Sequence, residues 1–380
     1  MWNPQGIYTN FILKQPVIFH GEEAFRGLFD FPGNRIAVIY GNGMSDNAQQ
    51  LIEGIFKHRS LCFIKKSWKD EPSIDELDMA VKQLEEFNPD IIVAIGGGSV
   101  IDGAKLCRIC FEFPYIDWKT NRLSQMVFKT RFIAVPTTLG SGAEASSAAV
   151  YYSKGDKTKK MAVCHALQPE VVIFDPEYVK NAPASILYPS IADALAHMIE
   201  GYVSNIRNPF AEEMAVWGIS IIRQEMEQGS KDKIDFMRLQ YAGYLGGIVQ
   251  NHCLVGATHA FAHQLTSYGF SHGKAVSLLL LRTIQMNQKN KEVEKVYQEL
   301  AKKSGFSNID SMLFFLQEFI HHVEKENTQR LGNILSNCLL DKDFIQNVKS
   351  DPGGRGNPVP ITERYIEEFI GDFNYELFSR

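Results

Sequence analysis

The chain has no excess of basic residues, no long apolar run and few cysteines. Its 39 Lys and Arg are outnumbered by 44 Asp and Glu, giving a formal net charge of −5. Because phosphate-binding surfaces are basic, this balance argues against nucleic acid and against an anionic membrane as partners. No apolar run reaches the roughly 18 residues that span a bilayer. The segment Met1–Asn10 also lacks the basic and apolar parts of a secretory signal, so we expect a cytoplasmic protein.

Cysteine is equally scarce, with six in 380 residues, which is too few for a disulfide framework. Cys107 and Cys110 form a Cys-x-x-Cys pair, but the second pair that a zinc ribbon needs is missing. Both fall within a predicted helix, Ser99–Cys110, and are expected to be ordinary buried thiols. The cysteine usage therefore fits a reducing cytoplasm.

The pattern of apolar residues changes near the middle of the chain. The first half alternates short β-rich runs with helical stretches such as Asn47–His58 and Ile74–Phe87, which is typical of βαβ units and a parallel sheet. From Pro183 onward the pattern is helical, and Pro183 and Pro189 punctuate the boundary. We predict an α/β domain over residues 1–182 and an all-helical domain over residues 183–380. The predicted strands are Pro16–Phe19, Ile36–Tyr40, Leu61–Ile64, Ile91–Ile95, Phe132–Val135 and Val171–Phe174.

Two turns of the first half have the composition of phosphate-binding loops. Gly96-Gly97-Gly98-Ser99 follows a predicted strand and opens a predicted helix, whose first N–H groups carry partial positive charge. It is neither Gly-x-Gly-x-x-Gly nor a Walker loop, and a tight strand–helix turn is the alternative explanation. A second turn rich in hydroxyls and glycine, Pro136–Glu144, follows another strand. Since ligands bind beyond the carboxyl ends of parallel strands, both turns point to one crevice.

The second half holds a cluster of potential metal ligands. Asp193 and His197 are four residues apart in a predicted helix and share one face, opposite its apolar residues. They would therefore either face water or hold a ligand. His259 and His263 repeat the spacing, and His272 follows. Imidazole and carboxylate together suit Fe²⁺ or Zn²⁺, and a structural zinc site is not expected without a cysteine pair.

These motifs, in this order, resemble the iron-containing (group III) alcohol dehydrogenases over nearly the whole chain. The resemblance implies a Rossmann-like α/β dinucleotide-binding domain, an all-α metal-binding domain as in dehydroquinate synthase, and an active site in the cleft between them. It also implies NAD(P)(H) and one divalent metal ion, Fe²⁺ or Zn²⁺, as cofactors. The matching stretches are Gly96–Asp102 with Lys105, Pro136–Gly140, Asp193–His197, Gly256–His263, Ser271–Gly273 and Asp351–Thr362.

Carried over residue by residue, the resemblance assigns a role to each motif. The metal ligands would be Asp193, His197, His259 and His272. His263 would lie near the nicotinamide without binding the metal, and we expect it to act as the catalytic proton relay. The implied cofactor-binding residues are Gly97, Gly98, Ser99 and Asp102 at the pyrophosphate, Thr137, Thr138, Ser141 and Ser146 along the ribose and nicotinamide, and Lys160 at the ribose.

The turn after Ile36–Tyr40 bears on the choice of dinucleotide. NAD-using members of the family often carry Asp there, whereas this chain has Gly41-Asn42-Gly43-Met44-Ser45, similar to NADP-using members. The glycine N–H groups of this turn, and the Asn42 and Ser45 side chains, could donate hydrogen bonds to a 2′-phosphate. No Lys or Arg follows immediately, and Asp46 is close. We expect a slight preference for NADP(H), which Gly41→Asp should shift toward NAD(H).

Other departures from the family pattern leave details open. Asp70-Glu71-Pro72 stands where the family often has Pro-Asn-Pro, and the loop between His263 and His272 is one residue shorter than in the propanediol oxidoreductases. One cofactor contact and one wall of the pocket are therefore not fixed by the resemblance.

We therefore expect a metal-dependent oxidoreductase that transfers hydride between NAD(P)(H) and a small primary alcohol or aldehyde, acting as a homodimer without nucleic-acid or membrane partners. Two alternatives stay open. A dehydroquinate synthase-like lyase would need several basic residues for its phosphate substrate, and the two predicted ligand helices contain no Lys or Arg. A non-catalytic scaffold of the same fold would have no need of an intact set of ligands.

Overall fold

The computed structural model describes residues 14–29, 31–116, 118, 123, 126–152, 159–322 and 325–371. These residues form two compact units, and the boundary in the sequence falls between Ala182 and Pro183. Within the described ranges, no helix combines the length and the apolar character needed to cross a membrane.

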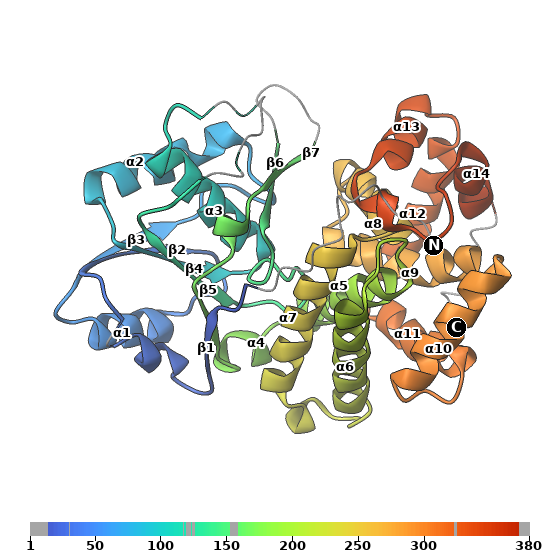
Figure 1. The fold of residues 1–380 in the computed structure, drawn as a ribbon, viewed down its shortest axis with the longest axis horizontal. Helices are drawn as coiled ribbons and strands as arrows, with labels where there is room; N and C mark the ends of the chain where they lie inside the picture. The colour runs from blue at the N-terminus through green and yellow to red at the C-terminus, as the bar shows by residue number, and fades with distance from the viewer. Residues whose placement is uncertain are drawn as a thin grey trace. The chain divides into compact units, whose positions relative to one another are not determined.

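A six-stranded parallel sheet forms the framework of the first unit (Figure 1). The strands lie in the order β1-β8-β5-β4-β2-β3, and every neighbouring pair is parallel. All six predicted strands are present. Their bounds are Val17–His20 for β1, Arg35–Tyr40 for β2, Ser60–Lys65 for β3, Ile91–Gly96 for β4, Arg131–Pro136 for β5 and Val171–Phe174 for β8.

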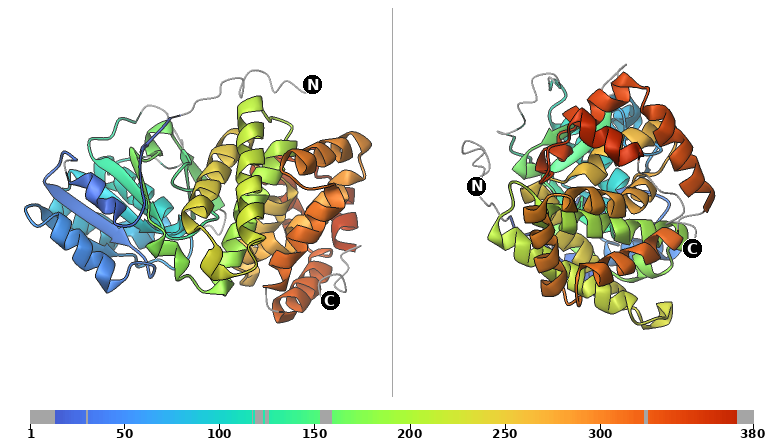
Figure 2. Two further views of the ribbon diagram at one scale, coloured as in Figure 1. Left: turned by 90° about the horizontal axis from the view of Figure 1, so that it is seen from below. Right: turned by 90° about the vertical axis from the view of Figure 1, so that its right-hand side faces the viewer.

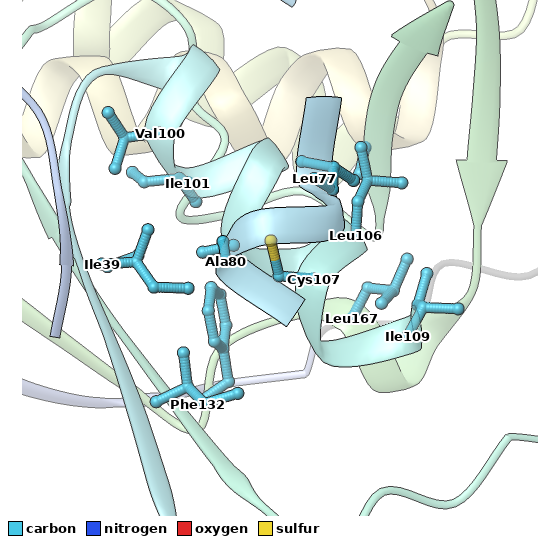
Figure 3. Close-up of a cluster of buried hydrophobic side chains, with 14 of the residues drawn as sticks. Ile39, Leu77, Ala80, Val100, Ile101, Leu106, Cys107, Ile109, Phe132 and Leu167 are labelled. Atoms are coloured by element: carbon cyan, nitrogen blue, oxygen red, sulfur yellow. The ribbon is translucent and has the colours of Figure 1, made fainter. Parts of the chain in front are cut away.

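Helices cover one face of this sheet through side chains that alternate along the strands. Helices α2 (Asp78–Phe87) and α3 (Gly98–Glu112) pack here. Figure 3 shows Ile39 of β2 and Phe132 of β5 in the cluster that also contains Cys107 of α3. The thiol of Cys107 is therefore part of the core, as expected for a buried free cysteine.

The other face of the sheet is covered by helix α1 (Asp46–Ile55) and the 3₁₀ helix η1 (Ala24–Leu28). Coverage of both faces explains why the strand sequences are apolar throughout rather than alternating. A hairpin of two antiparallel strands, β6 (Ala148–Tyr152) and β7 (Lys159–Val163), was not predicted. The short helix α4 (Glu177–Lys180) follows β8.

The second unit contains helices and no strand in its described residues. Helices α6, α7 and α9 contact the long helix α5, as Figures 1 and 2 show. The helices are α5 (Ala184–Val203), α6 (Pro209–Met226), α7 (Phe236–Cys253), α8 (Ala257–Leu265), α9 (His272–Gln288), α10 (Lys291–Lys303), α11 (Ile309–His321), α12 (Lys325–Cys338), α13 (Lys342–Ser350) and α14 (Glu363–Gly371).

Helix α5 differs from expectation in two respects. Pro189, expected to punctuate the domain boundary, lies inside the helix rather than before it. Every residue from Ile191 to Val203 is buried, because helices pack around α5 on several sides. Asp193 and His197 therefore lie in the interior, and the possibility that they face water on an amphipathic surface helix is wrong.

Candidate active site

Asp193 is at the centre of the histidine cluster. Its Oδ1 atom lies 3.3 Å from Nε2 of His259, 3.4 Å from Nε2 of His272 and 3.9 Å from Nε2 of His197. The potential ligand atoms of Asp193, His197 and His259 all lie within 4.8 Å of one another. Helix α5 supplies two of the four residues, α8 supplies His259, and His272 is the first residue of α9. The structure thus brings together the four residues that the sequence predicted as metal ligands.

Burial and mutual attraction determine the charges of this cluster. Burial alone would raise the pKa of Asp193, but the imidazoles of His197 and His272 bring that pKa well below its ordinary range. Burial lowers the pKa of His197 to about 3 and also lowers the pKa of His272. Asp193 is therefore a charged carboxylate and His197 a neutral imidazole, which are the forms in which these side chains bind a metal ion.

A second buried carboxylate, Glu200, orients His259. Its Oε2 atom accepts hydrogen bonds from Nδ1 of His259 at 2.6 Å and from the N–H of Gly256 at 2.9 Å. Its Oε1 atom accepts from the N–H of Thr258 at 2.7 Å. Burial acts to lower the pKa of His259, but the charge of Glu200 raises it to about 10. Because Nδ1 is held by Glu200, Nε2 of His259 must point toward Asp193.

The donor set fits a divalent transition metal. Oδ1 of Asp193 and Nε2 of His259 are buried and make no hydrogen bond with any described residue, although they are 3.3 Å apart. Leaving two such atoms unsatisfied is unfavourable, and a cation between them would satisfy both. One carboxylate with three imidazoles suits Fe²⁺ or Zn²⁺, and a ligating histidine usually donates its other N–H to a carboxylate, as His259 does to Glu200.

His263 lies one helical turn after His259 but has different surroundings. Its Nδ1 atom is 2.9 Å from Oδ2 of Asp351, which precedes the 3₁₀ helix η6 (Gly353–Gly356). The His263 side chain is 28% exposed, against 3% for His259. Its ring stacks on that of His272 with the centroids 5.4 Å apart. His263 is therefore beside the cluster and open to solvent, with one ring nitrogen held by Asp351. Asp351 begins one of the stretches that match the family, but no role of its own was predicted for it from the sequence.

In the α/β unit, the two glycine- and hydroxyl-rich turns pack against each other. A Cβ atom on Gly97 would lie 3.0 Å from Oγ1 of Thr138, and one on Gly98 would lie 2.6 Å from Cβ of Ser141. The paired ends of β4 and β5 hold the turns in this position. Close packing between the turns therefore accounts for both glycines, whether or not a phosphate also binds there.

The turn after β2 packs onto the same region. A Cβ atom on Gly43 would lie 2.7 Å from Oγ1 of Thr137, and one on Gly41 would lie 2.8 Å from Cγ2 of Val100. Asn42, between the two glycines, is exposed. The first unit thus gathers three predicted cofactor-binding turns at the carboxyl ends of β2, β4 and β5.

The remaining predicted cofactor residues have partners within the protein. The buried hydroxyl of Ser146 accepts a hydrogen bond from Nζ of Lys105 at 3.1 Å. Asp102, one turn into α3, accepts from the N–H of Val150 at 3.1 Å, and burial raises its pKa to about 6. Lys160 is exposed on strand β7. Asp102 and Ser146 therefore connect α3 to the loop before β6 and to β6 itself, a role that the sequence analysis did not foresee.

Comparisons with known proteins identify the family. The sequence-family model of iron-containing alcohol dehydrogenases matches residues 16–176 of this chain. The family model of the C-terminal part of Fe-containing alcohol dehydrogenases matches residues 189–369. An alcohol dehydrogenase of Thermococcus barophilus is 30% identical over 317 residues, covering 78% of this chain and 80% of that protein. An NADPH-dependent butanol dehydrogenase of Clostridium saccharobutylicum is 26% identical over 322 residues, covering 79% of this chain and 81% of that protein.

The fold agrees with that of a solved relative. The structure of an iron-containing alcohol dehydrogenase from Thermococcus thioreducens aligns with a TM-score of 0.85 at 24% identity, covering 97% of this chain and 100% of that one. The predicted fold class, an α/β unit followed by an all-helical unit, is confirmed. Together, the two domain matches and the relative that is 30% identical show that this chain belongs to the iron-containing alcohol dehydrogenase family.

Proposed function

We propose that this chain is an NAD(P)(H)-dependent enzyme that interconverts a small primary alcohol and its aldehyde, using one Fe²⁺ or Zn²⁺ ion held by Asp193, His197, His259 and His272. The convergence of three imidazole Nε2 atoms on one buried oxygen of Asp193 carries the proposal. The family supports an alcohol oxidoreductase, and its matched relatives favour neither the lyase nor the scaffold alternative.

The residues of this chain have distinct tasks in the proposed reaction. When bound, the metal ion supplies Lewis acidity at the substrate oxygen and the nicotinamide carries the hydride. Glu200 fixes the orientation of His259, and the burial of Asp193 and His197 keeps water away from the ligand atoms of these two residues. Asp351 holds Nδ1 of His263, which leaves Nε2 of this partly exposed ring to exchange a proton with the substrate oxygen or with water.

For the dinucleotide, the proposal retains a slight preference for NADP(H). The turn after β2 presents Asn42 and glycine N–H groups and has no carboxylate in its first positions. Gly41→Asp is a poor test, because the new Cβ would lie 2.8 Å from Cγ2 of Val100. Asn42→Asp places a carboxylate at an exposed position instead. It should shift the ratio of kcat/KM for the two cofactors about tenfold toward NAD(H), or about 1.4 kcal/mol.

The function is tested with anaerobically purified protein, metal analysis and a panel of alcohols and aldehydes assayed with both dinucleotides. His272→Ala should lose metal and turnover while the dinucleotide Kd stays unchanged, because the cofactor turns belong to the other unit. The control is His252→Ala, since Nδ1 of His252 contacts its own helix at the carbonyl oxygen of Ile248. Absence of turnover with every alcohol and aldehyde, or full metal content and activity in His272→Ala, would overturn the proposal.

A further inference from the structure

We propose that Lys66 binds the 2′-phosphate of NADP(H) and so determines the dinucleotide preference of this enzyme. Lys66 directly follows β3, and its N–H donates to the carbonyl oxygen of Tyr40, the last residue of β2, at 3.0 Å. Its Nζ atom donates to Oγ of Ser99 in the glycine turn at 2.7 Å. Lys66 therefore connects the turn after β2 with the predicted pyrophosphate site. The inference rests on the proposed function, since it assumes that a dinucleotide binds at these turns.

The strand order places Lys66 on the adenosine side of that site. The pyrophosphate is expected at the start of α3, directly after β4. In the sheet, β5 with its hydroxyl-rich turn lies on one side of β4, and β2 and β3 lie on the other. If the nicotinamide half extends along the β5 turn, as the resemblance implies, the adenosine ribose must extend toward β2 and β3. In dinucleotide-binding folds, the residue that recognises the ribose 2′ substituent lies near the end of the strand next to the glycine turn. Here that strand is β2, and Lys66 is held against its last residue, Tyr40, by a backbone hydrogen bond.

The hydrogen bonds and charges around Lys66 suit it to bind an anion. Two of its three N–H groups donate to Oγ of Ser99 and to the carbonyl oxygen of Lys69, each at 2.7 Å. This leaves one N–H, among the contacts of the described residues, for an anion. Burial lowers the pKa of Lys66, whereas the nearby carboxylates of Asp70 and Glu71 raise it. The carboxylates of Asp70 and Glu71 would repel a 2′-phosphate but not a 2′-hydroxyl, and the charge of Lys66 offsets that repulsion.

No Lys or Arg immediately follows the turn after β2 in the sequence. The structure supplies a cation from the residue that follows β3, the neighbouring strand. Lys65 is a natural control, because it precedes Lys66 as the last residue of β3 and its side chain is exposed, whereas that of Lys66 is partly buried.

The test measures binding to the full-length protein by calorimetry, with NADP⁺, NAD⁺, 2′,5′-ADP and 5′-ADP as probes. Lys66→Met should weaken the binding of NADP⁺ and of 2′,5′-ADP about 10- to 100-fold, the range for losing a hydrogen bond to a charged group. Binding of NAD⁺ and 5′-ADP should change by less than about threefold, well below that range. Lys66→Arg should retain most of the NADP⁺ affinity, and Lys65→Met should behave as wild type. A thermal melt of each variant shows whether it is folded. If Lys66→Met does not fold, Lys66→Arg still tests the inference, because a large loss of NADP⁺ affinity in this charge-conserving variant would contradict it.

Equal losses of affinity for NADP⁺ and NAD⁺ in Lys66→Met would overturn the inference, because Lys66 would then act on the pyrophosphate that both cofactors share. So would an unchanged NADP⁺ affinity in Lys66→Met, or the same loss in Lys65→Met. These outcomes differ from failure of the proposed function, in which the wild-type protein itself would bind none of the four probes.

Discussion

Replacing Glu200 by glutamine preserves the shape of the side chain that orients His259 but removes one acceptor. Glu200 is 2% exposed and accepts three hydrogen bonds, two at Oε2 and one at Oε1. Glutamine has a single oxygen, so its NH₂ group must face at least one donor in either orientation. If the NH₂ group faces His259, it donates to Nδ1 and the ring proton moves to Nε2, the atom directed at Asp193.

Both orientations of the glutamine side chain should weaken metal binding and lower the stability of the fold, and the lost contacts set the size of each effect. Losing the group that orients a ligating histidine typically lowers metal affinity about 10- to 100-fold. A buried N–H left without its acceptor costs about 1–3 kcal/mol, so the metal-free protein should also lose about 2 kcal/mol of unfolding free energy. Dinucleotide affinity should be unchanged, since the cofactor turns belong to the other unit.

Competition with a chelator for Zn²⁺, and for Fe²⁺ under anaerobic conditions, measures the metal affinity of Glu200→Gln. The matched control is Glu225→Gln, another buried carboxylate, which accepts from the N–H of Asp235 at 2.9 Å and pairs with Arg238. That variant should lose stability without losing metal. Wild-type metal affinity in Glu200→Gln, or an equal loss of affinity in the control, would refute the role assigned to Glu200.

Three further changes test other parts of the structure. Asp351→Asn should lower kcat about 100-fold with the metal retained, because an amide can donate to Nδ1 of His263 and reverse its tautomer; loss of metal or an unchanged kcat contradicts this. Leu254 has φ 58° and ψ −176°, a conformation for glycine, so in urea denaturation Leu254→Gly should be more stable than Leu254→Ala by about 1 kcal/mol or more; the reverse order contradicts it. Burial raises the pKa of Asp102 from 3.8 to about 6. Folding therefore favours its protonated form, and up to about 3 kcal/mol of stability is lost as the pH rises through that interval. Without dinucleotide, Asp102→Asn should then exceed wild type in unfolding free energy at pH 7.5 but not at pH 4; a difference independent of pH contradicts this.

The sequence predicted the six strands of the sheet because their apolar runs are short and bounded by polar turns. It did not reveal the hairpin β6–β7, although β6 alternates between buried and partly exposed residues. The residues on both faces of β6 are Ala, Val and Tyr, so buried and partly exposed positions do not differ in polarity. The sequence therefore lacks the apolar–polar alternation by which a strand is recognised. Helix α5 was misjudged for the opposite reason, since its apolar stripe was visible but the packing that buries the other face was not.

The candidate site was visible in the sequence only where spacing along one helix carries information. Asp193 with His197, and His259 with His263, stand out at helical spacing. Asp351 contacts His263 from 88 residues away, and Lys66 reaches Ser99 from 33 residues away. No periodicity connects such pairs, because they meet only through the packing of separate elements. The sequence held one weak signal for Glu200, its position three residues after His197 on the same helix.

The polar contacts around α8 link the geometry of the metal site to the position of a whole helix. The N–H groups at the start of α8 have no acceptor within the helix. Those of Gly256 and Thr258 donate to Glu200, and that of Ala257 donates to Oδ1 of Asn357 at 3.1 Å. A carboxylate is also stabilised by the positive end of the helix dipole. The carboxylate that orients His259 therefore fixes the helix that carries it, so the protein can hold its ligands in place before a metal ion binds.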